Sequence, residues 1–178
     1  MARRLRLDHP GARHHVYNRS ARREQLFTTD SHCAAFMHVL AQLGPLFGVR
    51  VHGYALMPNH FHLMLSCPRG GLPHAMQYLQ SRYSRHVNDV GGRDGPVWRG
   101  RYRNRLVETE EYWRHLLTYL HLNPTRAGLE EAPGTWAWTS HASYVGRRSS
   151  RGWVETDELR RLYGSPKAYQ AYLVDQLA

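Results

Sequence analysis

The sequence predicts an α+β fold in which helices pack against an antiparallel sheet within a single domain. Its 178 residues fall in the usual one-domain range. Segments of alternating hydrophobicity and segments with helical spacing follow one another in the order strand, helix, strand, strand, helix, strand, helix. No internal repeat, low-complexity tract or convincing interdomain linker divides the chain, so all seven elements are expected to share one core.

The first strand is predicted over residues 14–19 and is followed by a loop rich in charged residues and turn formers. Over residues 31–47, apolar side chains recur every three or four positions, which predicts a helix. Asp30 or Ser31 is available as its N-cap.

Two β-prone runs, over residues 49–57 and 60–66, are separated only by Pro58 and Asn59. This pair favours a turn and cannot continue a strand ladder, so the two runs are expected to form a hairpin. Helical spacing resumes after the next loop and predicts an amphipathic helix through Leu72, Met76, Leu79, Tyr83 and Val87.

Residues 97–108 alternate in character and predict a strand with arginines on one face and apolar residues on the other. Thr109 then starts a predicted helix that includes residues 112–123 and is ended by Pro124 and Gly128. A further helix is expected near residues 156–163. The four arginines of the predicted strand are Arg99, Arg101, Arg103 and Arg105.

The chain is strongly basic, with a formal charge of +10, and nearly all of its cations are arginines. The planar guanidinium group can bind two phosphate oxygens at once, so this composition favours a nucleic-acid partner. A solvated basic surface without a polyanionic partner is the competing interpretation.

Cys33 and Cys67 are the two cysteines, and their spacing is not that of a metal site. This argues against a disulfide scaffold and fits a reducing compartment, although one disulfide stays open. The basic N-terminus precedes no apolar segment, and about 18 apolar residues never run together. We therefore expect a cytoplasmic, nucleoid-associated protein with no membrane partner.

His60 and His62 form the first candidate functional pair. Side chains two positions apart in a strand share a face about 7 Å from each other, so both imidazoles can converge on one metal ion. On the predicted helix, Tyr119 and Asn123 lie one turn apart on one face, and the Asn123 amide would be a hard ligand suited to Mg²⁺ or Mn²⁺. A chance His-x-His pair, a half-buried tyrosine and a helix-ending asparagine are the competing interpretations.

Six separated motifs between residues 13 and 146 resemble those of the REP-associated (repetitive extragenic palindrome) tyrosine transposases. These belong to the single-tyrosine HUH transposases, which act on single-stranded DNA. Any one motif is weak evidence, but six in the same order are specific, above all MPNHFH followed by Y-x-x-x-N-P. The motifs are YNRSARREQLF, VHGYALMPNHFHLML, YLQSRYSRHVN, WRGRYRNRLVE, YLHLNPTRAGL and WAWTSHASYVG.

The resemblance implies a ferredoxin-like HUH domain over residues 1–146 and a C-terminal helical tail over residues 147–178. It also implies that His60 and His62 bind the metal and that Tyr119 is the catalytic nucleophile. Asn123 takes the place of the third ligand, where glutamine is usual in the wider transposase family.

The activity implied is metal-dependent nicking and strand transfer on DNA hairpins of the REP type. An ion held by these residues would polarise a phosphate oxygen, Tyr119 would hold a 5′-phosphotyrosine, and a free 3′-OH could reseal the strand without ATP. Tyr83, Tyr102 and Trp98 could stack on bases, although Trp98 better fits a core. The expected backbone contacts are Arg19, Arg22, Arg23, Arg82, Arg85, Arg99, Arg101, Arg103 and Arg105.

Two other functions stay open at this stage. One is a non-catalytic DNA- or RNA-binding regulator derived from a transposase, and the other is a metal-dependent phosphoesterase that uses water and needs no Tyr119. The resemblance favours a monomer over a dimer in which the partner supplies the helix with Tyr119, and no motif specifies a base sequence.

Overall fold

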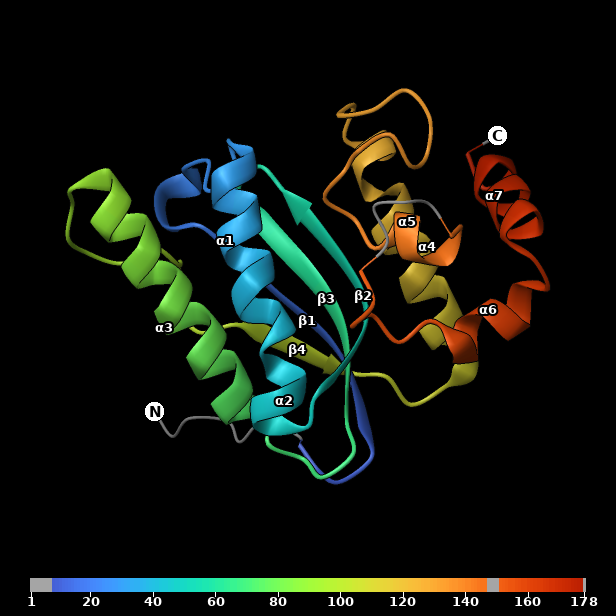
Figure 1. Cartoon of the computed structure of the whole chain (residues 1–178), viewed down its shortest axis with the longest axis horizontal. Coiled ribbons are helices and arrows are strands. Elements are labelled where there is room, and N and C mark those ends of the chain that lie inside the picture. Colours follow the sequence, from blue (N-terminus) through green and yellow to red (C-terminus); the bar gives the residue numbers. More distant parts are fainter. Residues whose placement is uncertain (1–7, 147–150, 178) are drawn as a thin grey trace.

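The computed structural model describes residues 8–146 and 151–177, and it confirms the predicted α+β class. A four-stranded antiparallel sheet has the order β2-β3-β1-β4, with helices on both faces (Figure 1). This order, with one helical segment between β1 and β2 and another between β3 and β4, is ferredoxin-like. The expected boundary between residues 146 and 147 borders residues outside the described part. The strands are β1 (Ala12–Arg19), β2 (Arg50–Met57), β3 (His60–Cys67) and β4 (Arg103–Leu106).

The first predicted helix is two helices, α1 (Asp30–Ala41) and α2 (Leu43–Phe47). Pro45 has no N–H to donate to the carbonyl of Ala41, so the prediction of one uninterrupted helix was wrong at this point. The predicted caps were also wrong, because the Thr29 hydroxyl is the group that accepts a hydrogen bond from the first turn of α1.

The hairpin of β2 and β3 around Pro58 and Asn59 is confirmed. Strand β1 pairs with β3 so that Arg19 lies opposite His60 and Tyr17 lies opposite His62. Because paired residues share a face, this register gathers basic and aromatic side chains of β1 around the two histidines.

Helix α3 (Leu72–Gly91) packs beside α1 on one face of the sheet (Figure 1). Between the helices and the sheet lies an aromatic cluster of Phe27, Phe36, Tyr83 and Trp98, all of them buried. Each such side chain contributes roughly 1.5–3 kcal/mol through removal from water, so this face is a rigid support for β3.

Strand β4 is much shorter than the run predicted over residues 97–108. Gly100 has φ +156°, and before Arg103 the ladder is reduced to an isolated bridge between Ser20 and Trp98. The prediction of one continuous strand was therefore wrong. The alternation persists nevertheless, since Trp98 and Tyr102 are buried while all four arginines are exposed.

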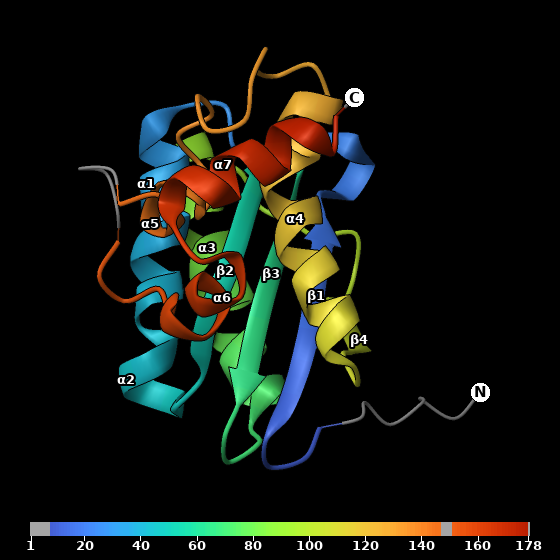
Figure 2. The ribbon, with the colours of Figure 1, turned by 90° about the vertical axis from the view of Figure 1, so that its right-hand side faces the viewer.

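Helix α4 (Glu110–Arg126) lies on the opposite face of the sheet from α1 and α3 (Figures 1 and 2). Its N-cap is Thr109, whose hydroxyl accepts a hydrogen bond from the Tyr112 N–H, as the sequence predicts. The predicted end at Pro124 was wrong. Proline removes one backbone donor but the helix runs on to Arg126, and Gly128 follows in the left-handed region with φ +69°.

Helix α4 packs closely against Gly53, where β2 has an irregular register. A Cβ at this position would lie 3.3 Å from methyl carbons of both Leu117 and Leu120. Because Gly53 has no side chain, α4 can lie this near to the sheet. The same spacing determines how far Tyr119 and Asn123 of α4 lie from β3.

Three short helices complete the chain: α5 (His141–Tyr144), α6 (Asp157–Tyr163) and α7 (Pro166–Asp175). Helix α6 confirms the expected helix near residues 156–163, and α7 was not predicted. Tyr169 of α7 lies within hydrogen-bond distance of the buried His121 ring, so this segment packs directly on α4 (Figure 2). Among the described residues, every helix is too short or too polar to pass through a lipid bilayer.

Candidate active site

His60 and His62 lie on the face of β3 that α4 covers. Their ring centroids are 5.2 Å apart with an interplanar angle of 87°. Two imidazoles that share an ion through bonds of ~2.1 Å have centroids roughly 5–6 Å apart. The pair is thus spaced to hold one metal ion.

Each of these histidines has one ring nitrogen engaged by a neighbour. Nδ1 of His60 lies 2.8 Å from Oδ1 of Asn59, and Nδ1 of His62 lies 3.0 Å from Nε2 of His15. The His15 ring in turn has its Nδ1 3.5 Å from the Tyr112 hydroxyl. Such contacts fix the orientation of a ligating imidazole and leave Nε2 of both His60 and His62 for an ion.

Asn59 and His15 are the site residues that the sequence reasoning missed. The signal was present for His15, because alternation along the first strand places His15 and Tyr17 on one face. It could not be used, since only the pairing of β1 with β3 brings that face to His62.

Burial keeps the central imidazoles uncharged. Desolvation, together with the nearby rings of His15 and His60, lowers the pKa of His62 to about 3. Desolvation, with repulsion from Arg105, lowers the pKa of His15 to about 4. The pKa of His60 is lowered by burial as well. Neutral imidazoles are the form that binds metals.

Tyr119 of α4 stands over this pair. Its hydroxyl lies 3.4 Å from Nε2 of His62, and the two ring centroids are 5.3 Å apart. Burial raises the pKa of the phenol, while the side chain of Asn123 and the charge of Arg126 lower it. Tyr119 is therefore protonated near neutral pH, and its phenolate needs help from the site.

Asn123 lies one helical turn beyond Tyr119, as predicted. Its Nδ2 is buried and has no hydrogen-bond partner of good geometry within the described chain, although the amide lies close enough to favour the Tyr119 phenolate. An amide in this condition can turn to present its oxygen to another group, which is what a third metal ligand requires.

Two cavities meet at the histidine pair. A cavity of about 420 Å³ contains the tyrosine and is lined by His15, Tyr17, His62, Arg105, Tyr112, His115, Leu116 and Tyr119. A cavity of about 560 Å³ is lined by Tyr17, Asn18, Arg19, Arg23, Asn59, His60, Arg99, Gly100, Arg101 and Arg103. Tyr17 lines both cavities, so the two are neighbours, with His60 in the wall of the arginine-rich one and His62 in the wall of the one that contains Tyr119.

The short 3-10 turn η1 (Ala21–Arg23) adds a smaller basic cavity of about 320 Å³, lined by Arg19, Ser20, Arg22, Arg23 and Arg99. Arg22 and Arg23 both have left-handed backbone conformations, with φ of 58° and 61°. Residues other than glycine rarely adopt this conformation, and such strain is concentrated at binding sites.

Not every predicted contact lies near this site. Arg82 and Arg85 extend from α3, on the opposite face of the sheet, and line neither of the two cavities (Figure 1). Tyr83 and Tyr102 are buried, so the expectation that they stack on bases was wrong. They pack in the core because the helix face and strand face that carry them point inward.

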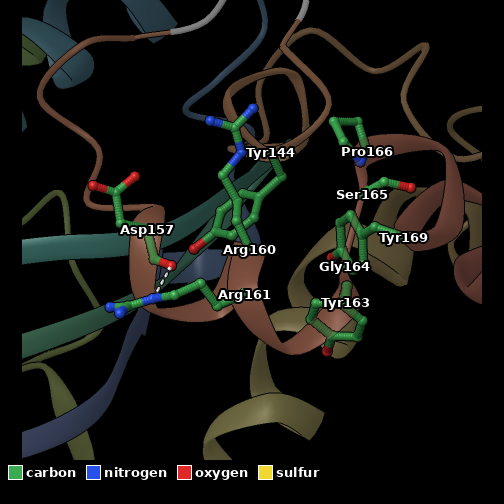
Figure 3. Close-up of a pocket in the computed structure, with 9 residues that line it drawn as sticks. All are labelled: Tyr144, Asp157, Arg160, Arg161, Tyr163, Gly164, Ser165, Pro166 and Tyr169. Atoms are coloured by element: carbon green, nitrogen blue, oxygen red, sulfur yellow. Dashed lines mark hydrogen bonds between the residues drawn. The ribbon is translucent and has the colours of Figure 1, made fainter.

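A further cavity, of about 590 Å³, lies in the C-terminal segment, away from the histidine pair. Figure 3 shows Tyr144 and Arg160 on one side of it and Tyr163, Ser165 and Tyr169 on the other. Its two innermost hydroxyls are engaged: Tyr144 donates to the carbonyl of His52, and Tyr169 contacts His121. This cavity holds no arrangement of nucleophile and metal ligands, and we do not assign it to the chemistry.

Comparison with known proteins places this geometry in a family. The model of the family described as "Transposase IS200 like" matches residues 10–123, which include His60, His62, Tyr119 and Asn123. A curated protein of Haemophilus influenzae, named as a REP-associated tyrosine transposase, is 23% identical over 96 residues. That match covers 48% of this chain and 54% of the relative, so the chain spans about half the relative's length.

Among solved structures, a REP-associated tyrosine transposase bound to a REP hairpin aligns with 88% of this chain and 93% of its own, at a TM-score of 0.68 and 18% identity. A Deinococcus radiodurans protein described as a transposase aligns with 67% of this chain and 93% of its own, at a TM-score of 0.46 and 17% identity. The first of these supports the fold. Because the family model covers well over half of the sequence, this chain belongs to the IS200-like transposases, a family of DNA-cleaving enzymes.

Proposed function

We propose that this protein is a metal-dependent endonuclease and strand transferase that acts on single-stranded DNA hairpins through Tyr119. The observation that carries the proposal is the Tyr119 hydroxyl 3.4 Å from Nε2 of His62, which neighbours a second histidine, His60, that lines an arginine-rich cavity. A nucleophile, a candidate metal site and an anion-binding surface are thereby adjacent, which is what phosphodiester cleavage requires.

His60, His62 and Asn123 are the residues that we propose to hold a divalent ion. When bound, Mg²⁺ or Mn²⁺ supplies Lewis-acid stabilisation of the scissile phosphate. Two imidazoles suit Mn²⁺ better than Mg²⁺, which prefers oxygen ligands. We therefore expect half-maximal activity at a roughly tenfold lower concentration of Mn²⁺ than of Mg²⁺.

In the proposed reaction, the Tyr119 oxygen attacks the phosphorus and the bond from phosphorus to the 3′ oxygen breaks. Tyr119 loses its proton to solvent, the 3′ oxygen gains one, and the protein keeps a 5′-phosphotyrosine. A free 3′-OH can reverse the same exchange and reseal the strand, because the phosphodiester bond energy is retained. Asn123 lowers the pKa of Tyr119 and so assists formation of its phenolate.

The DNA backbone is proposed to follow the arginine-lined cavity towards Tyr119. Exposed guanidinium groups that line this path can neutralise successive phosphates, and a single strand is flexible enough to follow them to Tyr119. The relative bound to a REP hairpin supports a palindromic hairpin as the substrate class. The proposed contacts are Arg19, Arg22, Arg23, Arg99, Arg101, Arg103 and Arg105.

The test is incubation of the pure protein with end-labelled single-stranded hairpins and Mn²⁺ or Mg²⁺, followed by a denaturing gel. We expect a covalent adduct that EDTA abolishes and that Tyr119→Phe reduces at least 10³-fold without loss of DNA binding. Tyr78→Phe is the matched control, because Tyr78 loses the same hydroxyl but lies on α3 and lines neither cavity, so this variant is expected to retain most activity.

Each competing function has its own result in this experiment. Cleavage that survives Tyr119→Phe and leaves no adduct would identify a phosphoesterase that uses water. Tight hairpin binding without cleavage by either metal would identify a non-catalytic regulator.

A further inference from the structure

A second group of metal-ligating side chains lies at the far end of the sheet. Asp8, His14 and Cys67 each offer one ligand atom, and these atoms all lie within 4.8 Å of one another. In the register of β1 with β3, Cys67 pairs with Ala12, whereas His60 pairs with Arg19 seven residues away. At ~3.3 Å per residue, the group is roughly 23 Å from His60, so it is distinct from the catalytic pair.

The side chains of this group are buried without adequate partners. His14 and Cys67 are both 0% exposed. Oδ1 of Asp8 and Nε2 of His14 are inaccessible and face each other across 3.7 Å, the distance of a loose ion pair, with no further hydrogen bond among the described residues. Buried polar groups with so little compensation are costly, and a cation between them would satisfy both atoms at once.

We propose that Asp8, His14 and Cys67 supply three of the four ligands of a structural zinc site, with water in the fourth tetrahedral position. Sulfur, imidazole nitrogen and carboxylate oxygen are the usual protein ligands of Zn²⁺, and a tetrahedral ion with bonds of ~2.0–2.3 Å places its ligand atoms about 3.3–3.7 Å apart. The separation of Asp8 from His14 already matches this value.

The charges of the group also suit a buried dication. A carboxylate and a thiolate together balance the two charges of zinc, and the ion displaces one proton from the Cys67 thiol on binding.

Neighbouring groups orient two of the ligands. Oδ2 of Asp8 accepts a hydrogen bond of 2.9 Å from the Gly71 N–H, which leaves Oδ1 for the ion. Nδ1 of His14 lies 3.5 Å from the side-chain amide of Asn104, and this amide can turn its oxygen to accept the Nδ1 proton. The site would fasten Asp8 to the ends of β1 and β3 and to the start of α3.

The probe that tests this proposal is Co²⁺, added at one equivalent to reduced protein that has been stripped with a chelator. A thiolate ligand gives an intense near-ultraviolet charge-transfer band, which a site made of histidine and amide cannot give. We expect this band in the wild type and in His60→Ala/His62→Ala, so the result is independent of the proposed function.

Cys67→Ala should remove the band, and Asp8→Asn should weaken Co²⁺ binding at least tenfold while keeping the acceptor for Gly71. Cys33→Ala is the matched control, since Cys33 is the other buried thiol and lies on α1. Zinc at about 100 times its Kd should raise the Tm of the wild type by roughly 5–10 °C, but not that of Cys67→Ala. An absent band, or one that survives Cys67→Ala, would overturn the proposal.

Discussion

At the scale of single residues, the candidate site depends on how its imidazoles are held. The His15 ring orients His62 through Nε2, which lies 3.0 Å from Nδ1 of His62. His15 does not itself line the arginine-rich cavity. A residue in this position acts through its neighbour, so its removal should weaken metal binding more than DNA binding.

We expect His15→Ala to raise the Mn²⁺ concentration for half-maximal adduct formation by about 10–100-fold and to leave hairpin affinity unchanged. The measurement is a metal titration of the initial rate of adduct formation. His115→Ala is the matched control, because His115 lines the same cavity and its side chain is 63% exposed. An unchanged metal requirement in His15→Ala would contradict the assignment.

His52 is a residue whose burial controls stability rather than chemistry. It packs against Trp113, and desolvation together with Arg13 and Arg50 lowers its pKa from 6.5 to about 4. The unfolded chain therefore binds more protons than the folded chain between these two pH values. Stability from this group is complete above pH 6.5 and is lost as the pH falls towards 4.

The expected contribution of His52 is on the order of 2 kcal/mol of unfolding free energy between pH 7 and pH 4.5. Denaturant unfolding at several pH values should show a flatter profile for His52→Gln than for the wild type. His38→Gln, at an exposed position of α1, should reproduce the wild-type slope. Equal slopes in His52→Gln and the wild type would show that His52 is not buried in its neutral form.

At the scale of elements, the contact of α4 with β2 sets the position of Tyr119. Helix propensity and the Thr109 cap determine that α4 forms, but they do not fix its distance from the sheet. That distance is set at Gly53, where Leu117 and Leu120 leave no space for a side chain.

Gly53→Ala should therefore destabilise the fold by about 1–3 kcal/mol and slow adduct formation, because α4 must move by a few tenths of an ångström. Gly44→Ala is the matched control and should have the opposite effect on stability. Gly44 lies in α2, and its nearest neighbour to a new Cβ is at an ordinary 3.6 Å, so alanine should stabilise by roughly 0.5–1 kcal/mol. Chemical denaturation and adduct rates measured on both variants check this pair, and equal effects would contradict it.

At the scale of the whole molecule, a group of arginines lies on the same side as the histidine pair. The arginines beside His60 come from β1, from the turn after it and from the segment before β4, which are distant in sequence. The net charge of +10 alone would draw DNA to any surface, so the local density of guanidinium groups is what directs the strand to Tyr119.

Arg99→Ala should weaken hairpin binding and lower the slope of log affinity against log salt by about 0.7, the value for one phosphate contact on a single strand. Arg82→Ala, on the far face, removes the same charge and should leave the slope unchanged. Fluorescence anisotropy between about 50 and 200 mM salt measures both variants. An unchanged slope in Arg99→Ala would contradict this contact, and a lowered slope in Arg82→Ala would mean that DNA also contacts α3.

The C-terminal segment also packs against α4, the helix that carries Tyr119. His121 is fully buried and is held between the hydroxyls of Tyr169 and Ser140. His121 lies on a different face of α4 from Tyr119, and the sequence alone does not predict that this face is buried. Only the packing of α7 and of the segment before α5 makes that second face of α4 an interior one.

The sequence by itself determined the four strands, the main helices and their order, because periods of two and of three to four residues are local properties of the chain. The face shared by His60 and His62 and the phase of Tyr119 relative to Asn123 follow from the same periods. The predicted elements ran through the local breaks at Pro45 and Gly100, whereas Pro124 was given too much weight, since α4 continues past it to Arg126.

Only the tertiary structure decided which of these surfaces meet. The pairing of β1 with β3 brings His15 to His62, and the close approach at Gly53 brings α4 over both. The same pairing, continued to the other end of the strands, places Cys67 beside His14 and Asp8 although no local spacing signals a metal site. Strand register and helix distance join residues that are far apart in the chain, and the free energy that fixes them belongs to the core as a whole.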